Sequence, residues 1–205
     1  MSTAKRSPLA LAVLAMLFEA PMHPYRMQHL IKERGKDEVI NVAQRANLYQ
    51  TIKRLEREGL VVALRTIRDV KRPQRTIYAI TASGRAAVRA WMRSMLSTPT
   101  REYPEFPAAI SFLALLTPKD AVRQFERRAT AIAAELQRID ELLKQAAPVP
   151  RLFLLETEYL RALQAVELSW VNALCKDLRA GDLGWSAAWL RKIAQQFSPA
   201  TIIAE

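Results

Sequence analysis

Hydrophobic residues recur at helical spacing along most of the chain, in segments that prolines and glycines separate. The first apolar segment, 7–20, predicts a helix with Ser7 as its N-cap and Pro8 in its first turn. A second helix is expected to begin near Pro24 and to stop at Gly35. Because the first segment is apolar nearly all round, we expect that helix to be buried on most sides.

A third helix is predicted over 44–58, and its two faces differ in character. Leu48, Ile52 and Leu55 are four and three positions apart, so they share one apolar face. The opposite face is polar and mostly basic. It carries Asn47, Gln50, Lys53, Arg54 and Arg57.

Two strands and a basic loop follow this helix. The strands are predicted over 60–66 and 76–80, where β-branched and apolar residues concentrate. The cations of the loop between them are Arg68, Lys71, Arg72 and Arg75. Thr81 is expected to cap a fourth helix over 82–96. A basic hairpin after a basic-faced helix outlines a winged helix-turn-helix, so the predicted fold is mainly α with a small β-hairpin wing.

The second half of the chain is predicted to be helical. Prolines concentrate in a linker over 98–117, between a first domain over 1–97 and a helical domain over 118–205. Two long helices are expected in the last domain, each with apolar residues repeating at steps of three and four. The first presents Val122, Phe125, Ala129, Ile132, Leu136, Ile139 and Leu143. The second presents Leu155, Tyr159, Ala162, Val166, Trp170 and Ala173.

A lone pair of antiparallel helices is not enough to bury both apolar seams. We therefore predict a homodimer in which a second copy of the chain covers them. The predicted dimerisation residues are Val122, Phe125, Ile132, Leu136, Ile139, Leu155, Tyr159, Val166 and Trp170. The alternative is that the helix pair folds back onto the first domain.

Charge is distributed unevenly between the two halves. The chain holds 31 basic and 20 acidic residues, a net charge of +11. Residues 1–100 contain 18 basic and 7 acidic residues, whereas 101–205 contain 13 of each. The whole excess therefore lies in the first domain, a pattern typical of a domain that binds a polyanion. A basic surface retained only for solubility is the alternative.

Few residues point to catalysis or to a metal site. The two histidines, His23 and His29, are six positions apart, and Cys175 is the only cysteine. The five glycines form no phosphate-binding loop, and no serine lies in a nucleophile elbow. We predict that the protein is not an enzyme, and that it has no catalytic residues, metal or cofactor.

The location of the protein is predicted from its first residues and its single thiol. Lys5 and Arg6 precede an apolar run over 9–18, which imitates a signal peptide. The run is short, and the following residues Glu19-Ala20-Pro21 make a poor cleavage site. Together with the lone cysteine, which suits a reducing compartment, this favours a cytoplasmic protein.

Three segments and the long helix pair resemble the PadR family of transcriptional regulators. The residues from 46 to 61 (ANLYQTIKRLEREGLV) resemble the recognition helix and following strand, and 72–84 (RPQRTIYAITASG) resembles the wing and the start of the fourth helix. His23-Pro24-Tyr25 resembles the entry to the second helix. The C-terminal helices resemble the dimerisation region of members with a larger C-terminal domain. Ala46, Gln50 and Pro24 depart from the usual glycine, proline and glycine.

The resemblance implies a homodimeric regulator of transcription, chiefly a repressor. A dimer in turn implies a pseudo-palindromic DNA operator, and we expect the protein in association with the nucleoid. Some relatives also respond to small molecules such as phenolic acids. A helix that fits the major groove reads base edges near its N-terminus, and Asn47 and Gln50 suit adenine. Tyr49 is expected on a phosphate or a thymine methyl group, with Arg45, Lys53 and Arg54 on phosphates. The wing, 66–76, is expected on the adjacent minor groove or the backbone.

Other functions remain open at this point. A winged helix also suits structured RNA, although the narrow A-form major groove does not admit side chains that read bases. A basic module that binds an acidic protein is another alternative. An effector pocket is conceivable among Trp91, Met92, Met95 and Trp170, although such residues more often form the core.

Overall fold

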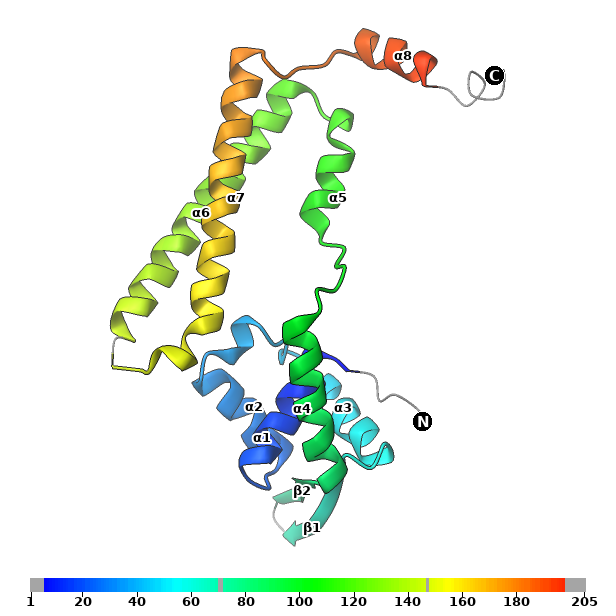
Figure 1. Ribbon diagram of the computed structural model, residues 1–205, viewed down its shortest axis with the longest axis vertical. Coiled ribbons are helices and arrows are strands. Elements are labelled where there is room, and N and C mark those ends of the chain that lie inside the picture. The colour runs from blue at the N-terminus through cyan, green and yellow to red at the C-terminus, as the bar shows by residue number, and fades with distance from the viewer. Residues whose placement is uncertain (1–5, 70–71, 147, 198–205) are drawn as a thin grey trace. The chain divides into compact units, whose positions relative to one another are not determined.

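The computed structural model describes residues 6–69, 72–146 and 148–197, and for 66–69 and 72–75 it describes the backbone alone. The chain forms two compact units, Met1–Arg101 and Glu102–Glu205 (Figure 1). Over these described residues the fold is mainly helical with a two-stranded hairpin, as the sequence predicted. Within the described residues, no helix is long and apolar enough to cross a membrane.

The first unit opens with helices α1 (Pro8–Glu19), α2 (Pro24–Glu33) and α3 (Arg45–Arg57). The Ser7 hydroxyl accepts a hydrogen bond from the backbone N–H of Ala10 at 3.2 Å, so the predicted N-cap is confirmed. A short 3-10 turn, Lys36–Glu38, follows α2. Gly35, which precedes this turn, has a φ of 64°, a left-handed conformation that glycine adopts without strain.

The hairpin strands β1 (Val61–Asp69) and β2 (Arg72–Ile80) are longer than predicted. They pair antiparallel from Val61 opposite Ile80 to Asp69 opposite Arg72. Most of the expected loop is therefore strand, because the backbone ladder continues through residues whose polarity masked the pattern. The sequence rule relies on β-branched and apolar residues, whereas ladder hydrogen bonds need only backbone groups.

The strands lead into α4 (Ala82–Ser97), as predicted. The Thr81 hydroxyl accepts a hydrogen bond from the N–H of Gly84 at 3.0 Å and so caps this helix. Met22, between α1 and α2, pairs with Tyr78 of β2 through two backbone hydrogen bonds of 3.0 and 3.1 Å. This bridge fastens the start of the helix-turn-helix to the base of the wing.

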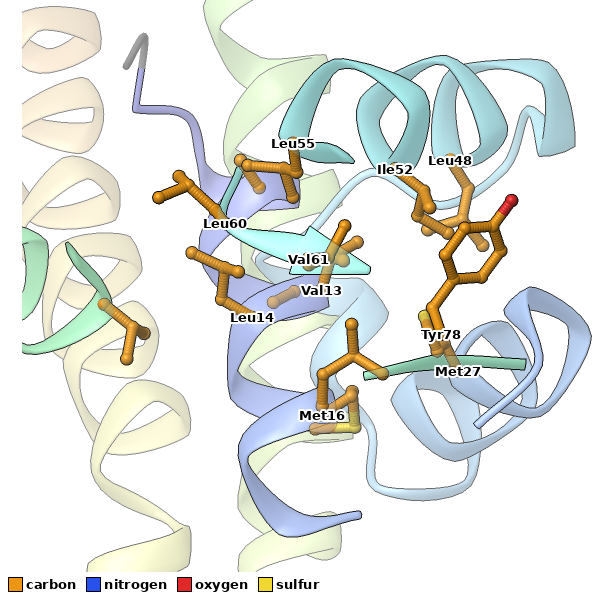
Figure 2. Close-up of a cluster of buried hydrophobic side chains, with 14 of the residues drawn as sticks. Val13, Leu14, Met16, Met27, Leu48, Ile52, Leu55, Leu60, Val61 and Tyr78 are labelled. Carbon is orange, nitrogen blue, oxygen red and sulfur yellow. The ribbon is translucent and has the colours of Figure 1, made fainter. Parts of the chain in front are cut away.

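One hydrophobic cluster holds the first unit together (Figure 2). Helix α1 lies at its centre, as its nearly all-round apolar sequence predicted. The cluster also draws on α2, α3, the start of β1 and one residue each of β2 and α4. Its fully buried side chains include Val13, Leu14, Leu17, Met27, Ile31, Leu48, Ile52, Leu55 and Val61.

The second unit contains α5 (Glu105–Ser111), α6 (Pro118–Gln145), α7 (Leu155–Ala180) and α8 (Ala187–Gln196). Two 3-10 turns, Leu113–Leu115 and Arg151–Phe153, precede α6 and α7. Helix α5 lies within the segment 98–117, where we predicted only a linker. Phe106 of α5 packs edge-to-face on Phe125 of α6, with ring centroids 6.4 Å apart. The prolines that suggested a linker flank or begin this helix instead of excluding one.

The two predicted apolar seams of the long helices have different fates. Phe125, Ile132 and Ile139 of α6 are buried within the single chain. By contrast, Tyr159, Val166 and Trp170 of α7 are exposed, and α7 turns Val171, Cys175 and Leu178 toward α6 instead. The expectation that both seams await a second copy is thus corrected for α6, because α7 of the same chain already covers it.

Val122 and Leu136, the other predicted dimerisation residues of α6, are partly buried. Val122 packs against the buried cluster that Phe125 of α6 forms with Val171, Cys175 and Leu178 of α7. Leu155 of α7 is exposed like the rest of its seam. Burial raises the pKa of the Cys175 thiol above its ordinary value. This is the environment of an inert, packed cysteine.

Candidate nucleic-acid interface

The second helix of the helix-turn-helix, α3, is fixed by its inner face. Leu48, Ile52 and Leu55 are each at most 1% exposed and belong to the core cluster around α1. Their four- and three-residue spacing leaves the other side of the helix outside the core. The orientation of the polar face thus follows from three buried side chains.

A shallow, open hollow lies on the outer face of α3 and is lined by residues of polar and charged types. It is lined by Asn47, Gln50, Thr51, Lys53, Arg54, Glu56 and Arg57. The sequence from 39 to 55 contains no acidic residue, so the N-terminal part of this face carries only positive and neutral groups. A surface of this kind attracts a polyanion and offers amide groups that can hydrogen-bond to base edges.

The predicted contact residues on α3 differ in how far they are exposed. Asn47, Gln50 and Lys53 are exposed. Arg54 is less exposed, and its guanidinium forms an ion pair with Glu58 one turn later at 3.1 Å. Tyr49 is 41% exposed, and so part of its ring is available to a ligand.

The turn between α2 and α3 is fixed by a residue that the sequence analysis did not single out. Gln28 is buried, and its Nε2 donates a hydrogen bond to the Val42 carbonyl at 2.8 Å. Asn41 Oδ1 accepts from the N–H of Ala43 at 3.2 Å and tightens the same turn. A glutamine between the apolar residues Met27 and Ile31 was the available signal, because a buried amide needs a partner.

Arg45, the first residue of α3, is exposed and lies beside α2. Its guanidinium carbon is 5.8 Å from the centroid of the Tyr25 ring. The contact places one cation at the junction of the two helices of the motif. Arg45 therefore stands next to the amide-bearing face at the N-terminal end of α3.

The wing carries the other predicted cations of the interface. Lys71 lies outside the described residues, and the side chains of Arg68, Arg72 and Arg75 are outside them too. The backbone register places Arg75 opposite Ile67 and Arg72 opposite Asp69. Their contacts with a ligand stay predictions.

The residues considered for an effector pocket belong to different units. Trp91 is partly buried against the core of the first unit, Met95 is partly buried and Met92 is exposed. Trp170, in the second unit, packs edge-to-face on Phe106 with centroids 6.2 Å apart. Each tryptophan thus has a packing role within its own unit.

A helix-turn-helix with a buried inner face, a polar outer face and a two-stranded wing defines a winged-helix DNA-binding protein. Residues 13–90 match the sequence profile of the transcriptional regulator PadR-like family. This match confirms the predicted resemblance over that segment, and it supports the predicted class of function, a DNA-binding regulator of transcription. This family is one of regulators rather than of enzymes.

Solved structures share the fold over most of the chain. Bacillus subtilis PadR in complex with operator DNA is 19% identical, with a TM-score of 0.65 over 84% of this chain and 99% of that chain. The same protein with p-coumaric acid is 18% identical, with a TM-score of 0.67 and the same coverage. The Vibrio cholerae virulence activator AphA is 17% identical, with a TM-score of 0.63 over 84% of this chain and 98% of that chain. No curated protein sequence matches this chain.

Proposed function

We propose that the protein is a homodimeric transcriptional repressor that reads a pseudo-palindromic DNA operator with α3 in the major groove. The observation that carries the proposal is the division of α3 into a fully buried face and an outer face rich in amides and cations. A helix fixed in this way enters the groove as a rigid body, so its side chains meet bases at defined positions.

The roles of the outer residues follow from their chemistry. Asn47 and Gln50 each carry an amide that can both donate and accept, the pattern that adenine presents in the major groove. Lys53 carries a charge without such a pattern and suits a phosphate, as do Arg45 and Arg54. For Arg54, a phosphate would have to compete with Glu58. Tyr49 can donate to a phosphate or lie on a thymine methyl group.

The wing supplies the second contact of each half-site. Its backbone ladder runs from Val61 opposite Ile80 to Asp69 opposite Arg72, and four cations are spread over 68–75. An arginine in this loop suits a narrow minor groove, where the negative potential is strongest. We propose Arg68, Lys71, Arg72 and Arg75 for this contact.

Dimerisation is proposed through the exposed face of α7. Leu155, Tyr159, Leu163, Val166 and Trp170 are exposed apolar residues at steps of three and four. A second copy of α7 would bury this stripe and pair two α3 helices for operator half-sites about one helical turn apart.

The remaining parts of the proposal concern control and location. We include control by a small molecule, because Bacillus subtilis PadR, a protein of this fold, is known in complex with p-coumaric acid. The ligand of this chain is not assigned. We further propose that the protein has no enzymatic activity and acts in the cytoplasm on the nucleoid.

The proposal is tested by titrating the protein against a labelled duplex of its own upstream intergenic region. Random duplex DNA and duplex RNA serve as competitors, at two salt concentrations. Asn47→Ala and Gln50→Ala should lose preference for the operator, by about 1–3 kcal/mol per base contact. Lys53→Ala should weaken binding to every duplex alike and make that binding less dependent on salt. Lys192→Ala, a change of the same charge in α8, is the control.

Preference for the operator by about 10³-fold or more over random DNA supports the proposal. For six to eight phosphates per dimer, the slope of log K against log salt should be roughly −5 to −7. A preference for duplex RNA would favour the RNA-binding alternative. Equal, weak and salt-insensitive binding to every duplex would favour a module for an acidic protein.

A further inference from the structure

Tyr25, the second residue of α2, is a large aromatic side chain that the core does not use. It is 60% exposed, although its neighbours Pro24 and Met27 are buried. Its ring makes two defined contacts instead. The Arg45 guanidinium lies over it at 5.8 Å, and the His29 imidazole is stacked with it at 6.4 Å and an interplanar angle of 8°.

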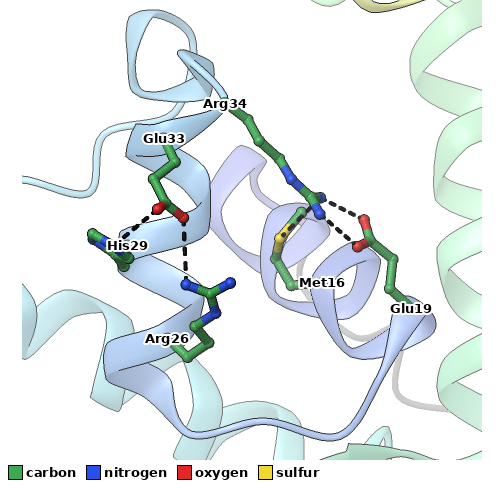
Figure 3. A network of polar contacts seen from close by, with 6 residues as sticks. All are labelled: Met16, Glu19, Arg26, His29, Glu33 and Arg34. Atoms are coloured by element: carbon green, nitrogen blue, oxygen red, sulfur yellow. Dashed lines mark hydrogen bonds and ion pairs between the residues drawn. The ribbon is translucent and has the colours of Figure 1, made fainter.

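The surroundings of Tyr25 hold its ring in place. Its backbone N–H donates to Nδ1 of His23 at 3.1 Å, which caps the start of α2. The imidazole on which it stacks is itself tied, because His29 Nε2 lies 3.0 Å from a Glu33 carboxylate oxygen (Figure 3). Arg26 reaches the other oxygen of that carboxylate at 3.4 Å. The Tyr25 ring thus has a tied stacking partner on its own helix, and the Arg45 guanidinium meets it from α3.

We propose that Tyr25 is a positioning residue, which holds the Arg45 guanidinium ready for a DNA phosphate at the N-terminal end of α3. The inference rests on the proposed function. A guanidinium held over a ring face by a cation–π contact still has N–H donors for another group, so the contact with Tyr25 and phosphate binding are compatible. An arginine held in this way has lost part of its rotamer freedom before DNA arrives, and less remains to be lost on binding.

The coupling between the two side chains is measurable in a double-mutant cycle. Tyr25→Ala, Arg45→Ala and the double variant are titrated with the operator duplex, and Asn47→Ala reports base reading. Removing an exposed cation–π contact should weaken binding about two- to fivefold per half-site, and about four- to 25-fold for a dimer with two half-sites. Arg45→Ala should weaken it at least as much. In the Arg45→Ala background, Tyr25→Ala should have no further effect.

Two further variants separate positioning from other roles. Tyr25→Phe keeps the ring and should bind the operator like the parent protein. If the Tyr25 hydroxyl itself contacted a phosphate, Tyr25→Phe would bind more weakly than the parent. Tyr103→Ala removes an 82% exposed tyrosine from the second unit and should leave binding unchanged. Thermal unfolding of all variants checks that the first unit keeps its stability, since Tyr25 buries little surface.

The proposal is overturned if Tyr25→Ala leaves affinity unchanged, or if its effect persists in full when Arg45 is already alanine. It is also overturned if Arg45→Ala has no effect while Asn47→Ala abolishes operator preference. In those cases the proposed function stands and only the positioning role fails. If instead neither Asn47→Ala nor Arg45→Ala changes binding, the proposed DNA interface on α3 itself is wrong.

Discussion

A Cβ atom added to Gly84 would lie only 2.1 Å from the carbonyl oxygen of Leu60. Gly84 is in the first turn of α4, and Leu60 immediately precedes β1. The same junction is tied by Thr81, whose N–H donates to the Leu60 carbonyl at 3.0 Å and whose hydroxyl donates to the Gly59 carbonyl at 2.7 Å. The end of α3, the base of the wing and the start of α4 therefore meet without room for a side chain.

Gly84→Ala is expected to destabilise the first unit. The atom in the way belongs to the backbone of Leu60, so relief requires a shift of α4 or of the wing. Overpacking of this kind costs about 1–3 kcal/mol, which urea unfolding would detect. Gly184→Ala is the matched control, because nothing lies within 4 Å of the added Cβ there. Equal stability of the two variants would show that the junction is looser than the geometry indicates.

The inner face of α3 predicts a second effect on stability. Leu55→Ala removes a fully buried side chain from the core cluster and should lower the free energy of unfolding by about 2–5 kcal/mol. Leu64→Ala makes the same chemical change on β1, where the leucine is 57% exposed, and should stay within about 0.5 kcal/mol of the parent. A similar loss in both would contradict the assignment of α3 to the core.

Most of the first unit could be predicted because its signals are local. Ser7 with Pro8, Gly35 and Thr81 each act within one turn, so sequence alone placed the ends of three helices. The steps between Leu48, Ile52 and Leu55 fixed the inner face of α3. The buried hydrogen bond of Gln28 could not be predicted, because its partner Val42 is chosen by tertiary packing.

The second unit shows where periodicity is not enough. The seams of α6 and α7 look alike in sequence, yet Phe125 is buried and Val166 is exposed. Helix α7 has apolar residues on two sides, and only the packing of α6 decides which side faces inward. Helix α5 was missed because its prolines suggested a linker. The wing side chains remain predictions, as do the individual DNA contacts.

The ion pair between α1 and α2 predicts a pH dependence of stability (Figure 3). Two hydrogen bonds from the Arg34 guanidinium, 2.6 and 2.8 Å long, lower the pKa of Glu19 below its ordinary value of 4.5, against a smaller opposing effect of burial. A carboxyl with a lowered folded-state pKa stabilises the protein above its unfolded pKa. This contribution is lost as the pH falls through the folded value.

Glu19→Gln should therefore cost stability at pH 7 and little at pH values below the lowered pKa. Both side chains are at least 40% exposed, so the loss at pH 7 should be about 0.2–1 kcal/mol. Urea unfolding of Glu19→Gln, Arg34→Gln and the double variant isolates the pair from the contact of Arg34 with Met16. If the interaction energy between Glu19 and Arg34 did not shrink on acidification, the pH dependence would not come from this ion pair.

The exposed stripe of α7 gives the test of the proposed homodimer. Val166 is 70% exposed. Tyr159 and Leu163, seven and three residues before it, and Trp170, four residues after it, lie on the same face of the helix. In a dimer that buries this stripe, Val166→Glu would place an unpaired carboxylate in an apolar interface, at a cost of several kcal/mol. We expect the parent protein to sediment as a dimer and Val166→Glu as a folded monomer with weakened operator binding. Ala134→Glu adds the same charge to an exposed position of α6 and should remain dimeric. A monomeric parent, or a Val166→Glu variant that stays dimeric, would exclude α7 as the interface.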